Sequence, residues 1–468
     1  MSLFGQLHLG LGGLRAHQYG LEMTGDNIAN VNTPGFSRRR LALSHARPLR
    51  VTPVGEIGGG VEAGPITSVR DRFLDSRHRL ESSVASADDA RHRLLGSVEG
   101  VFVEDGGFGF QEELSAMFNA FSDLGSEPES SVFRDQVLSK AQSLIDRMQG
   151  GHERLSQIAR TIDQDTIRLT AQANDLMERI ASLNEQISAI EATIPANAER
   201  DARDQALLEL SELIEVSSYE NEDGSATVTL RDGSSLVVGN QSFALNAVPT
   251  PPDGRTSLML GATDVTSLVG SGEIGGMLSV RSQEIPAHQL ALDDLALEMT
   301  SRVNTLHRAG YAMDGTTTNV DFFVPFTPVA PGNPQGATMA MSINPTVAAD
   351  GSAIAAAGAA GAIGDGDQAL AIADLASSQT MNGGTATFSE FYSGFVFTLG
   401  SDVRRAEASA TASSAVAEQV GLQKLEVSAV SLDEEAVALV QYQRGYEASA
   451  RFIRVVDELT ELVMTIGA

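Results

Sequence analysis

Residues 155–194 read LSQIARTIDQDTIRLTAQANDLMERIASLNEQISAIEATI, and this stretch has the most regular pattern in the chain. Apolar residues recur every seven positions from Leu155 to Ile190, and a second series from Ala173 to Ile194 lies on the adjoining seam. Heptad spacing over this length predicts a long coiled-coil-like α-helix of about 60 Å. Pro195 ends the pattern, because proline cannot continue a helix.

Composition limits the classes of protein that the chain can belong to. It has 468 residues, 42% of them apolar and 20% charged, which suffices for a sizeable core. The formal net charge of −29 argues against a nucleic-acid partner, because phosphate binding needs surplus Lys and Arg. The absence of cysteine excludes disulfides and thiolate metal sites. We expect no membrane-spanning helix and no cleaved secretory signal, since long apolar runs are missing.

The N-terminal segment carries another heptad series. It predicts a helix that ends near residues 31–35, where proline stops the helix and glycine permits the turn. Glycines at 10, 12, 13, 20 and 25 each cost about 1 kcal/mol relative to alanine, so the order of this helix must come from packing. The series consists of Leu7, Leu14, Leu21 and Ile28, with Leu11 on the adjoining seam.

The C-terminal segment has a matching pattern on a helix that runs almost to Ala468. Ser431 is expected to cap the turn that carries the acidic residues 433–435. Residues 1–50 carry a formal net charge of +4 and residues 425–468 one of −5, so pairing of the two ends is electrostatically favourable. The series consists of Leu425, Leu432, Leu439, Tyr446 and Ile453, with Tyr442, Ser449, Val456 and Val463 beside it.

Between its ends the chain is expected to be mainly helical, with β structure only in the middle. Residues 226–230 and 235–238 flank Asp232-Gly233, a strong hairpin signal, and residues 241–245 are a candidate third strand. The tetrapeptide Arg-His-Arg-Leu occurs at 77–80 and again at 91–94, which predicts a solvated basic stripe with anchoring leucines. Residues 324–366 are rich in Ala, Gly and Pro and form either a small lobe or a loosely ordered insertion.

The predicted fold class is therefore mainly α with a small β portion. Long coiled-coil-like helices come from the N- and C-terminal segments, around a central β-containing region and a short variable insertion. Three units are expected. They are residues 1–60 with 425–468 as a terminal-helix assembly domain (an inner tube), residues 61–323 with 367–424 as a helical bundle bearing the hairpin 226–245, and residues 324–366 as a reduced outer lobe or insertion.

The sequence contains no recognisable catalytic or metal-binding motif. The eight histidines show no metal-ligand spacing, and neither a nucleophile elbow nor a phosphate-binding Gly-Lys loop occurs. Residues 314–321 have the oxygen density of a calcium loop, but their glycine comes second rather than sixth. We therefore expect no catalytic, cofactor-binding or metal-binding residues and no cofactor, and the pattern favours assembly over catalysis.

Both ends resemble flagellar proteins. Residues 26–38, DNIANVNTPGFSR, are similar to the N-terminal signature shared by bacterial flagellar rod, hook and hook-associated proteins. Residues 431–435, SLDEE, and 442–451, YQRGYEASAR, resemble the matching C-terminal signature. The long heptad helix and the segments GGMLSVRSQ (275–283), DFF (321–323) and FSEFY (388–392) resemble one family in that group, hook-associated protein 1 (the FlgK family of hook–filament junction proteins).

This resemblance implies a structural part of the flagellum, in a ring of subunits between hook and filament. It implies export through the flagellar type III system without cleavage. The partners would be sister copies, the hook protein, a second hook-associated protein on the filament side, and a cytoplasmic export chaperone at the C-terminal region. The protein would be extracellular, and cytoplasmic only before export. The family usually has a larger outer β domain than the forty or so residues available here.

The apolar stripes at the two ends suggest how assembly works. A single chain can satisfy them only partly, so we expect the ends to be largely mobile in solution and to pair with each other and with neighbouring copies in a tube. The expected assembly interface comprises Leu7, Leu11, Leu14, Leu21, Ile28, Asn30, Asn32, Leu432, Leu439, Tyr442, Tyr446, Ile453 and Val456.

Three alternatives remain open at this point. One is another flagellar axial protein, a hook or distal rod subunit, although hook subunits are mostly β outside their terminal helices. Another is a peptidoglycan hydrolase that accompanies the flagellum, which would need a carboxylate pair or a zinc site in a cleft. The third is a soluble coiled-coil adaptor, which would form stable dimers with ordered ends.

Overall fold

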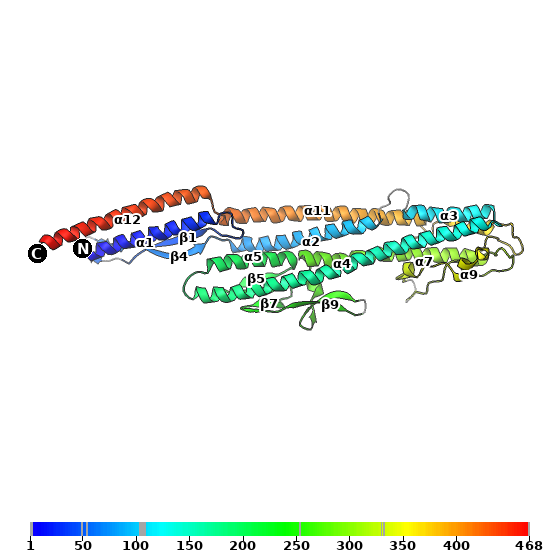
Figure 1. Cartoon of the computed structure of the whole chain (residues 1–468), viewed down its shortest axis with the longest axis horizontal. Helices are drawn as coiled ribbons and strands as arrows, with labels where there is room; N and C mark the ends of the chain where they lie inside the picture. The colour runs from blue at the N-terminus through cyan, green and yellow to red at the C-terminus, as the bar shows by residue number, and fades with distance from the viewer. Residues whose placement is uncertain are drawn as a thin grey trace.

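The computed structural model describes residues 3–47, 50–52, 55–102, 109–251, 254–328, 330 and 333–466. The molecule is elongated, and the two ends of the chain lie together at one end of it (Figure 1). Helix makes up 66% of the structure and strand 11%, so the prediction of a mainly α chain with a small β portion is confirmed.

The helix predicted from residues 155–194 is part of a longer helix, α4 (Ser131–Glu191), which has 61 residues and includes Gly150 and Gly151 without a break. Leu155, Ile162 and Leu169 are buried as the heptad predicts. An α-helix drifts by about 20° per heptad, so Leu176, three heptads after Leu155, is rotated by about 60°. Leu176 is only half-buried and its neighbour Met177 is fully buried, while Leu183 is buried again one heptad later.

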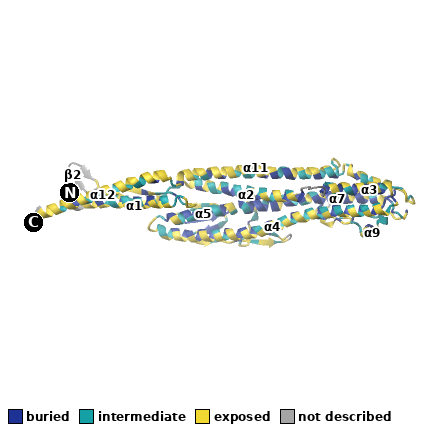
Figure 2. Ribbon diagram, turned by 45° about the horizontal axis from the view of Figure 1, so that its top comes forward, coloured by how far each residue is buried: buried dark blue, intermediate teal, exposed yellow. Residues whose placement is uncertain are grey.

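Helices from the whole length of the chain build the body around α4. One continuous core of buried residues runs through them, as the dark positions in Figure 2 show. Near its far end the rings of Phe121, Phe322 and Phe323 meet edge to face. The other helices of the body are α2 (Arg72–Phe102), α3 (Phe110–Ser126), α5 (Asn197–Leu213), α6 (Gly272–Ser279), α7 (Ile285–Ala309), α10 (Asp367–Ala373) and α11 (Phe388–Ser428). Short helical turns are η1 (Thr266–Leu268), η2 (Val280–Glu284, a π-helix that joins α6 to α7), η3 (Gly351–Ala353) and η4 (Asp374–Ala376).

Two antiparallel sheets cover one side of α4. The predicted hairpin is confirmed, since β6 (Ala226–Thr229) pairs with β7 (Ser235–Val238) and Gly233 takes the positive φ of +90° that the turn requires. Asn184 of α4 fixes this sheet, because it donates to Ala226 O at 2.7 Å and accepts from Ala226 N at 2.8 Å. The first sheet also contains β5 (Ser217–Glu220) and β8 (Gln241–Ser242), and the second consists of β9 (Leu245–Thr250), β10 (Arg255–Leu260) and β11 (Thr263–Asp264).

The prediction that β structure occurs only in the middle was wrong. β1 (Arg39–His45) pairs antiparallel with β4 (Val61–Ser68), and β2 (Arg50–Thr52) pairs with β3 (Gly55–Ile57). The β1–β4 register shifts between Leu41 and Leu43, so no regular alternation marks these strands in the sequence. β1 lies before residue 60 and β4 after it, so the expected end of the terminal unit at residue 60 would separate two paired strands. An end after Ser68 keeps both strands in one unit.

The Ala/Gly/Pro-rich segment 324–366 is built into the end of the bundle where it is described. It contains α8 (Ala337–Ala340) and α9 (Pro345–Ala349), and Val347 and Ile354 are buried in the common core. The buried guanidinium of Arg134 donates to Ile354 O at 2.7 Å, and His307 links the same segment to α7. These described residues therefore close the end of the bundle and do not form a projecting lobe.

His307 gives this end of the bundle a pH-dependent stability. Its Nε2 accepts from Ala355 N at 2.9 Å and its Nδ1 donates to Val320 O at 2.7 Å, so the neutral ring is the form that fits. Burial lowers the pKa of His307 below its usual 6.5, against the smaller effect of the Val320 carbonyl. The unfolded chain therefore binds more protons than the folded chain as pH falls below about 6.5, and stability is lost there.

We predict that His307→Gln reduces this loss. Between pH 7.5 and pH 5.5 the free energy of unfolding of the natural chain should fall by about 1 kcal/mol more than that of the variant. Denaturant titrations at the two pH values measure the difference, and all other titrating groups cancel in the comparison. Equal pH dependence in the two proteins would exclude the assignment.

Candidate assembly interface

The two ends of the chain pack against each other as antiparallel helices, α1 (Leu3–Ala29) and α12 (Leu432–Ile466) (Figure 1). Glycines make the close approach possible. A Cβ atom on Gly10 would lie 2.7 Å from Ile453 Cγ1, and one on Gly13 would lie 2.9 Å from Ser449 Oγ. On the opposite helix, a Cβ atom on Gly445 would lie 2.5 Å from the His17 ring. Gly10, Gly13 and Gly20, three of the glycines that make α1 a poor helix alone, therefore let α12 pack against it.

The predicted leucine series of α1 lies beside this contact. Ala16 and Met23 are buried, while the leucines are half-buried or exposed. Among the predicted interface residues, the buried one is Val456. Half-buried ones are Leu14, Leu21, Ile28, Asn30, Leu439, Tyr442 and Ile453. Exposed ones are Leu7, Leu11, Asn32, Leu432 and Tyr446.

The predicted C-terminal series is divided between two helices. α11 ends at Ser428 and α12 begins at Leu432, so Leu425 lies on the other side of the break from the rest of its series. Ser431 caps α12 as expected, with its Oγ 3.5 Å from Glu434 N and its carbonyl 3.0 Å from Glu435 N. The break gives the terminal helix pair its own direction relative to α11.

A second apolar stripe on α12 was missed in the sequence. Its residues recur at alternating steps of three and four but fall outside the predicted heptad register. This stripe is exposed, and it consists of Phe452, Val455, Leu459 and Leu462. Together with the exposed Leu7 and Leu11, it leaves the terminal pair with apolar surface that a single chain does not cover.

The two signature segments meet at the base of the terminal pair. Arg38 of the N-terminal signature donates to Glu434 at 2.6 Å and to Glu435 at 2.8 Å, and its backbone N–H donates to Ser428 O at 2.8 Å. Burial opposes the charge of Arg38, but the hydrogen bonds and charges of Glu434 and Glu435 outweigh it and raise its pKa. The acidic turn 433–435 therefore binds a specific arginine in addition to capping its helix.

The polar residues of the N-terminal signature mainly shape the chain around this contact. Asn27 exchanges two hydrogen bonds with the backbone of Arg39, at 2.9 and 3.0 Å. Asn30 donates to Asp26 and accepts from Thr33, so it stabilises the turn after α1. Asn30 thus has a local role in this chain, and its predicted place in an interface with other copies remains a prediction.

An arginine on the strand β4 side ties this base to the body. Arg70 lies 2.9 Å from Asp75 of α2 and 3.6 Å from Asp201 of α5, and it also pairs with Asp204. The charges of these carboxylates outweigh burial and raise the pKa of Arg70. Ser37 of the signature donates to the same Asp201. The terminal pair and the bundle are therefore joined by buried ion pairs.

Within the described part of the chain, no group of three or more His, Cys, Asp or Glu side chains is arranged to hold a metal ion. None of the described helices combines the length and the apolar character that crossing a membrane requires.

Comparison with known proteins identifies the family. Residues 95–323 match the flagellar hook-associated protein FlgK helical domain. Residues 423–466 match the C-terminal domain of the flagellar basal body rod FlgEFG proteins, and residues 7–36 match the flagella basal body rod protein family.

Relatives extend this similarity over almost the whole chain. Flagellar hook-associated protein 1 of Bacillus subtilis is 26% identical over 96% of this chain and 96% of its own length. The protein of the same name from Salmonella typhimurium is 24% identical over 97% of this chain and 98% of its own.

A solved structure shows the same fold. The flagellar hook junction protein FlgK from Burkholderia pseudomallei superposes with a TM-score of 0.67 at 18% identity, over 75% of this chain and all of that one. Its agreement with long helices and a central β region completes the assignment. The chain belongs to the flagellar hook-associated protein 1 (FlgK) family and is a structural component of the bacterial flagellum.

Proposed function

We propose that this protein forms the ring of subunits that joins the hook to the filament, and that it assembles through α1 and α12. The observation that carries the proposal is the exposed apolar stripe of the terminal pair, whose helices already use their glycine faces to bind each other. Burying exposed leucine and valine side chains between copies stabilises a tube by about 25 cal/mol per Å² of apolar surface. The similarity to hook-associated relatives over almost the full chain supports the same role.

The partners follow from this position. The ring would contact the hook protein on one side and a second hook-associated protein on the filament side. The chain would be exported uncleaved by the flagellar type III system, with its C-terminal region bound to a chaperone in the cytoplasm beforehand. Its site in the flagellum would be extracellular, and its role there would be structural and not catalytic.

We also propose that different parts of the chain form the inner and the outer layer of the assembled tube. Residues 1–68 with 432–468 would form the inner tube, and the bundle between them would form the outer wall. The predicted interface residues on α1 and α12 would contact neighbouring copies where they are exposed, and each other where they are half-buried. The break at residues 429–431 supports this division, since the helix is interrupted there and α12 is inclined to α11 (Figure 1).

Deletion of the gene tests the function. We expect cells with intact hooks that lack filaments, and filament protein released into the medium, as seen by electron microscopy and by immunoblot. Re-expression of the full chain should restore filaments. A strain that lacks hooks would indicate a rod or hook subunit, and labelled antibody on isolated flagella would place the protein along the axis.

The tails should become ordered in two stages. Ser37 and Arg38 are hydrogen-bonded to the body, at Asp201 of α5 and Ser428 of α11, whereas α1 contacts mainly α12 and the β1–β4 hairpin. The glycines weaken α1 as a helix, and most helical stability in proteins comes from packing of an apolar face. We therefore predict weak hydrogen-exchange protection of residues 5–25 in the free chain and strong protection in isolated flagella. Strong protection in the free chain would contradict the proposal that these helices are completed by sister copies.

A further inference from the structure

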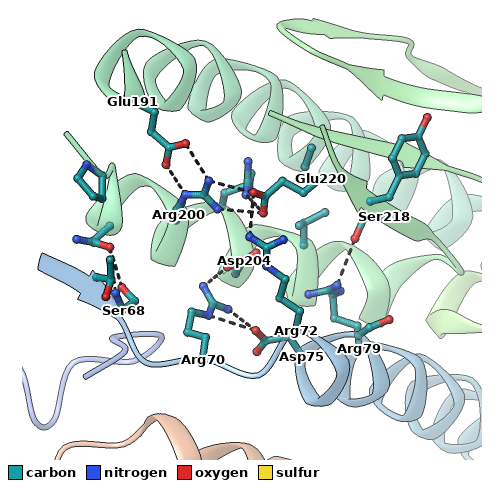
Figure 3. Close-up of a pocket in the computed structure, with 18 of the residues that line it drawn as sticks. Ser68, Arg70, Arg72, Asp75, Arg79, Glu191, Arg200, Asp204, Ser218 and Glu220 are labelled. Carbon is teal, nitrogen blue, oxygen red and sulfur yellow. Dashed lines mark hydrogen bonds and ion pairs between the residues drawn. The ribbon is translucent and has the colours of Figure 1, made fainter. Parts of the chain in front are cut away.

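A pocket of about 830 Å³ lies where β4, α2, α5 and β5 converge, away from the terminal helix pair (Figure 3). The sequence pattern had suggested a solvated basic stripe on α2, anchored by leucines. Instead Leu80 is 54% exposed, and Arg79 points into the pocket. The arginines that line it are Arg70, Arg72, Arg79, Arg200 and Arg203.

One side of this pocket has more positive than negative charge. Arg200 pairs with Glu191 at 2.9 Å and with Glu220 at 2.9 Å. Glu220 is also the carboxylate partner of Arg72, at 3.1 Å, and of Arg203, at 3.7 Å. Arg79 lies beside them, so five arginines of the pocket face the four carboxylates of Asp75, Glu191, Asp204 and Glu220 that also line it. Arg70 is different, because Asp75, Asp201 and Asp204 surround it.

Arg79 is the least satisfied of these arginines. Within the described residues it has no carboxylate at ion-pair distance, and it donates to the Ser218 hydroxyl at 3.2 Å. Burial lowers its pKa, and nearby Arg70 adds to this effect, while Asp204 and Asp75 oppose it. Its guanidinium has five N–H donors in a planar fork, which matches the two oxygens of a carboxylate. An arriving carboxylate would supply the missing countercharge.

The rim of the pocket suits a peptide. Ile194 and Tyr219 line it and are 63% and 58% exposed, and Arg72 stands at the mouth with a side chain that is 77% exposed. Apolar side chains at the rim would contact the residues that flank an acidic side chain. A free carboxylate such as citrate would make the charged contact alone, without using this apolar surface.

We propose that this pocket binds the carboxylate of an acidic side chain from a second copy of this chain, through Arg79 and Arg72. The chain has 61 acidic against 32 basic residues, so acidic side chains outnumber basic ones nearly two to one in a neighbouring copy. That the bound carboxylate comes from a second copy rests on the proposed ring assembly. That the pocket binds a carboxylate at all does not depend on the ring. The contact would join the outer bundles of neighbouring subunits, in addition to the contacts between terminal helices.

Titration of the purified full-length chain with citrate by calorimetry tests the chemistry. We expect binding that weakens as chloride is added, and a loss of affinity of about tenfold in each of Arg79→Gln and Arg72→Gln, since one charged hydrogen bond is worth about 1.5–3 kcal/mol. Arg168→Gln is the matched control, because Arg168 is an exposed arginine of α4 paired with Asp165. Circular dichroism shows whether each variant is folded, and the exposed Arg72 provides a variant that removes no buried group. No binding, or equal loss in Arg168→Gln, would overturn the proposal.

A photo-crosslinking residue in place of Tyr219 tests the source in isolated flagella. We expect mass spectrometry to find a crosslink to an Asp- or Glu-containing peptide of a second copy. A crosslink to another protein, or none between subunits in flagella that contain the ring, would refute the second copy as the source. Failure of the ring itself would appear separately, as absence of the protein from the hook–filament junction.

Discussion

Replacing Gly20 with leucine is expected to abolish filament attachment while the helical bundle stays folded. A Cβ atom at this position would lie 2.5 Å from Tyr442 Cδ1 and 2.7 Å from Cγ, far inside van der Waals contact. These atoms are the near edge of the ring, so a rotation of the tip of the side chain cannot relieve the clash. The two helices would have to separate, and the closely packed stripe from Gly10 to Gly20 would be lost along with the contact at Tyr442.

The same helix supplies a matched control for this experiment. A Cβ atom on Gly25 would meet nothing within 4 Å, so Gly25→Leu should support normal filaments. Both Gly25→Leu and Gly20→Leu gain about 1 kcal/mol of helix propensity, so the two variants differ only in what the new side chain contacts. The number of filaments per cell in a complemented deletion strain is the readout, with export of each variant checked by immunoblot. Filaments at the natural number in Gly20→Leu would refute the role assigned to the glycine face.

Short-range sequence signals correctly predicted one helix and one hairpin. The heptads at 155–194 marked α4, and Asp232-Gly233 marked the hairpin, because both signals lie within the element that they specify. The strands β1 and β4 were missed because their partners are separated by the segment 46–60 and their register contains a bulge. A strand pair without regular alternation has no signature in either strand alone.

The faces of the helices were harder to predict than the helices themselves. In α1 the leucines have the clearest period, yet Gly10, Gly13 and Gly20 are the residues in closest approach to α12, since close approach there requires small residues. In α2 the repeated Arg-His-Arg-Leu suggested a stripe in water, but α5 and β5 pack nearby and turn part of it into a charged pocket. Which face a neighbouring element covers is decided by the tertiary fold, and the period of one helix does not contain that information.

The contact between the two signatures should depend on charge balance at a single buried carboxylate. Glu435 is 1% exposed, and its Oε1 accepts from Arg38 Nε at 2.8 Å. Its Oε2 has no hydrogen-bond partner among the described residues. Removing Arg38 would leave a buried negative charge with no countercharge, which costs more than the loss of the pair itself.

We predict that Arg38→Ala weakens the first turns of α12 by about 2 kcal/mol, which is less than a fully buried pair would lose because about a third of Arg38 is exposed. Amides of residues 435–439 should then exchange roughly thirtyfold faster in the free chain. Glu434→Gln is the control, because the Glu434 side chain is 63% exposed and surface pairs contribute about 0–1 kcal/mol. Adding Glu435→Gln to Arg38→Ala removes the unpaired charge and should restore part of the protection, since an amide is cheaper to bury than a carboxylate. If the double variant exchanged as fast as Arg38→Ala alone, the loss would come from missing side-chain contacts, and charge would not be what holds the two signatures together.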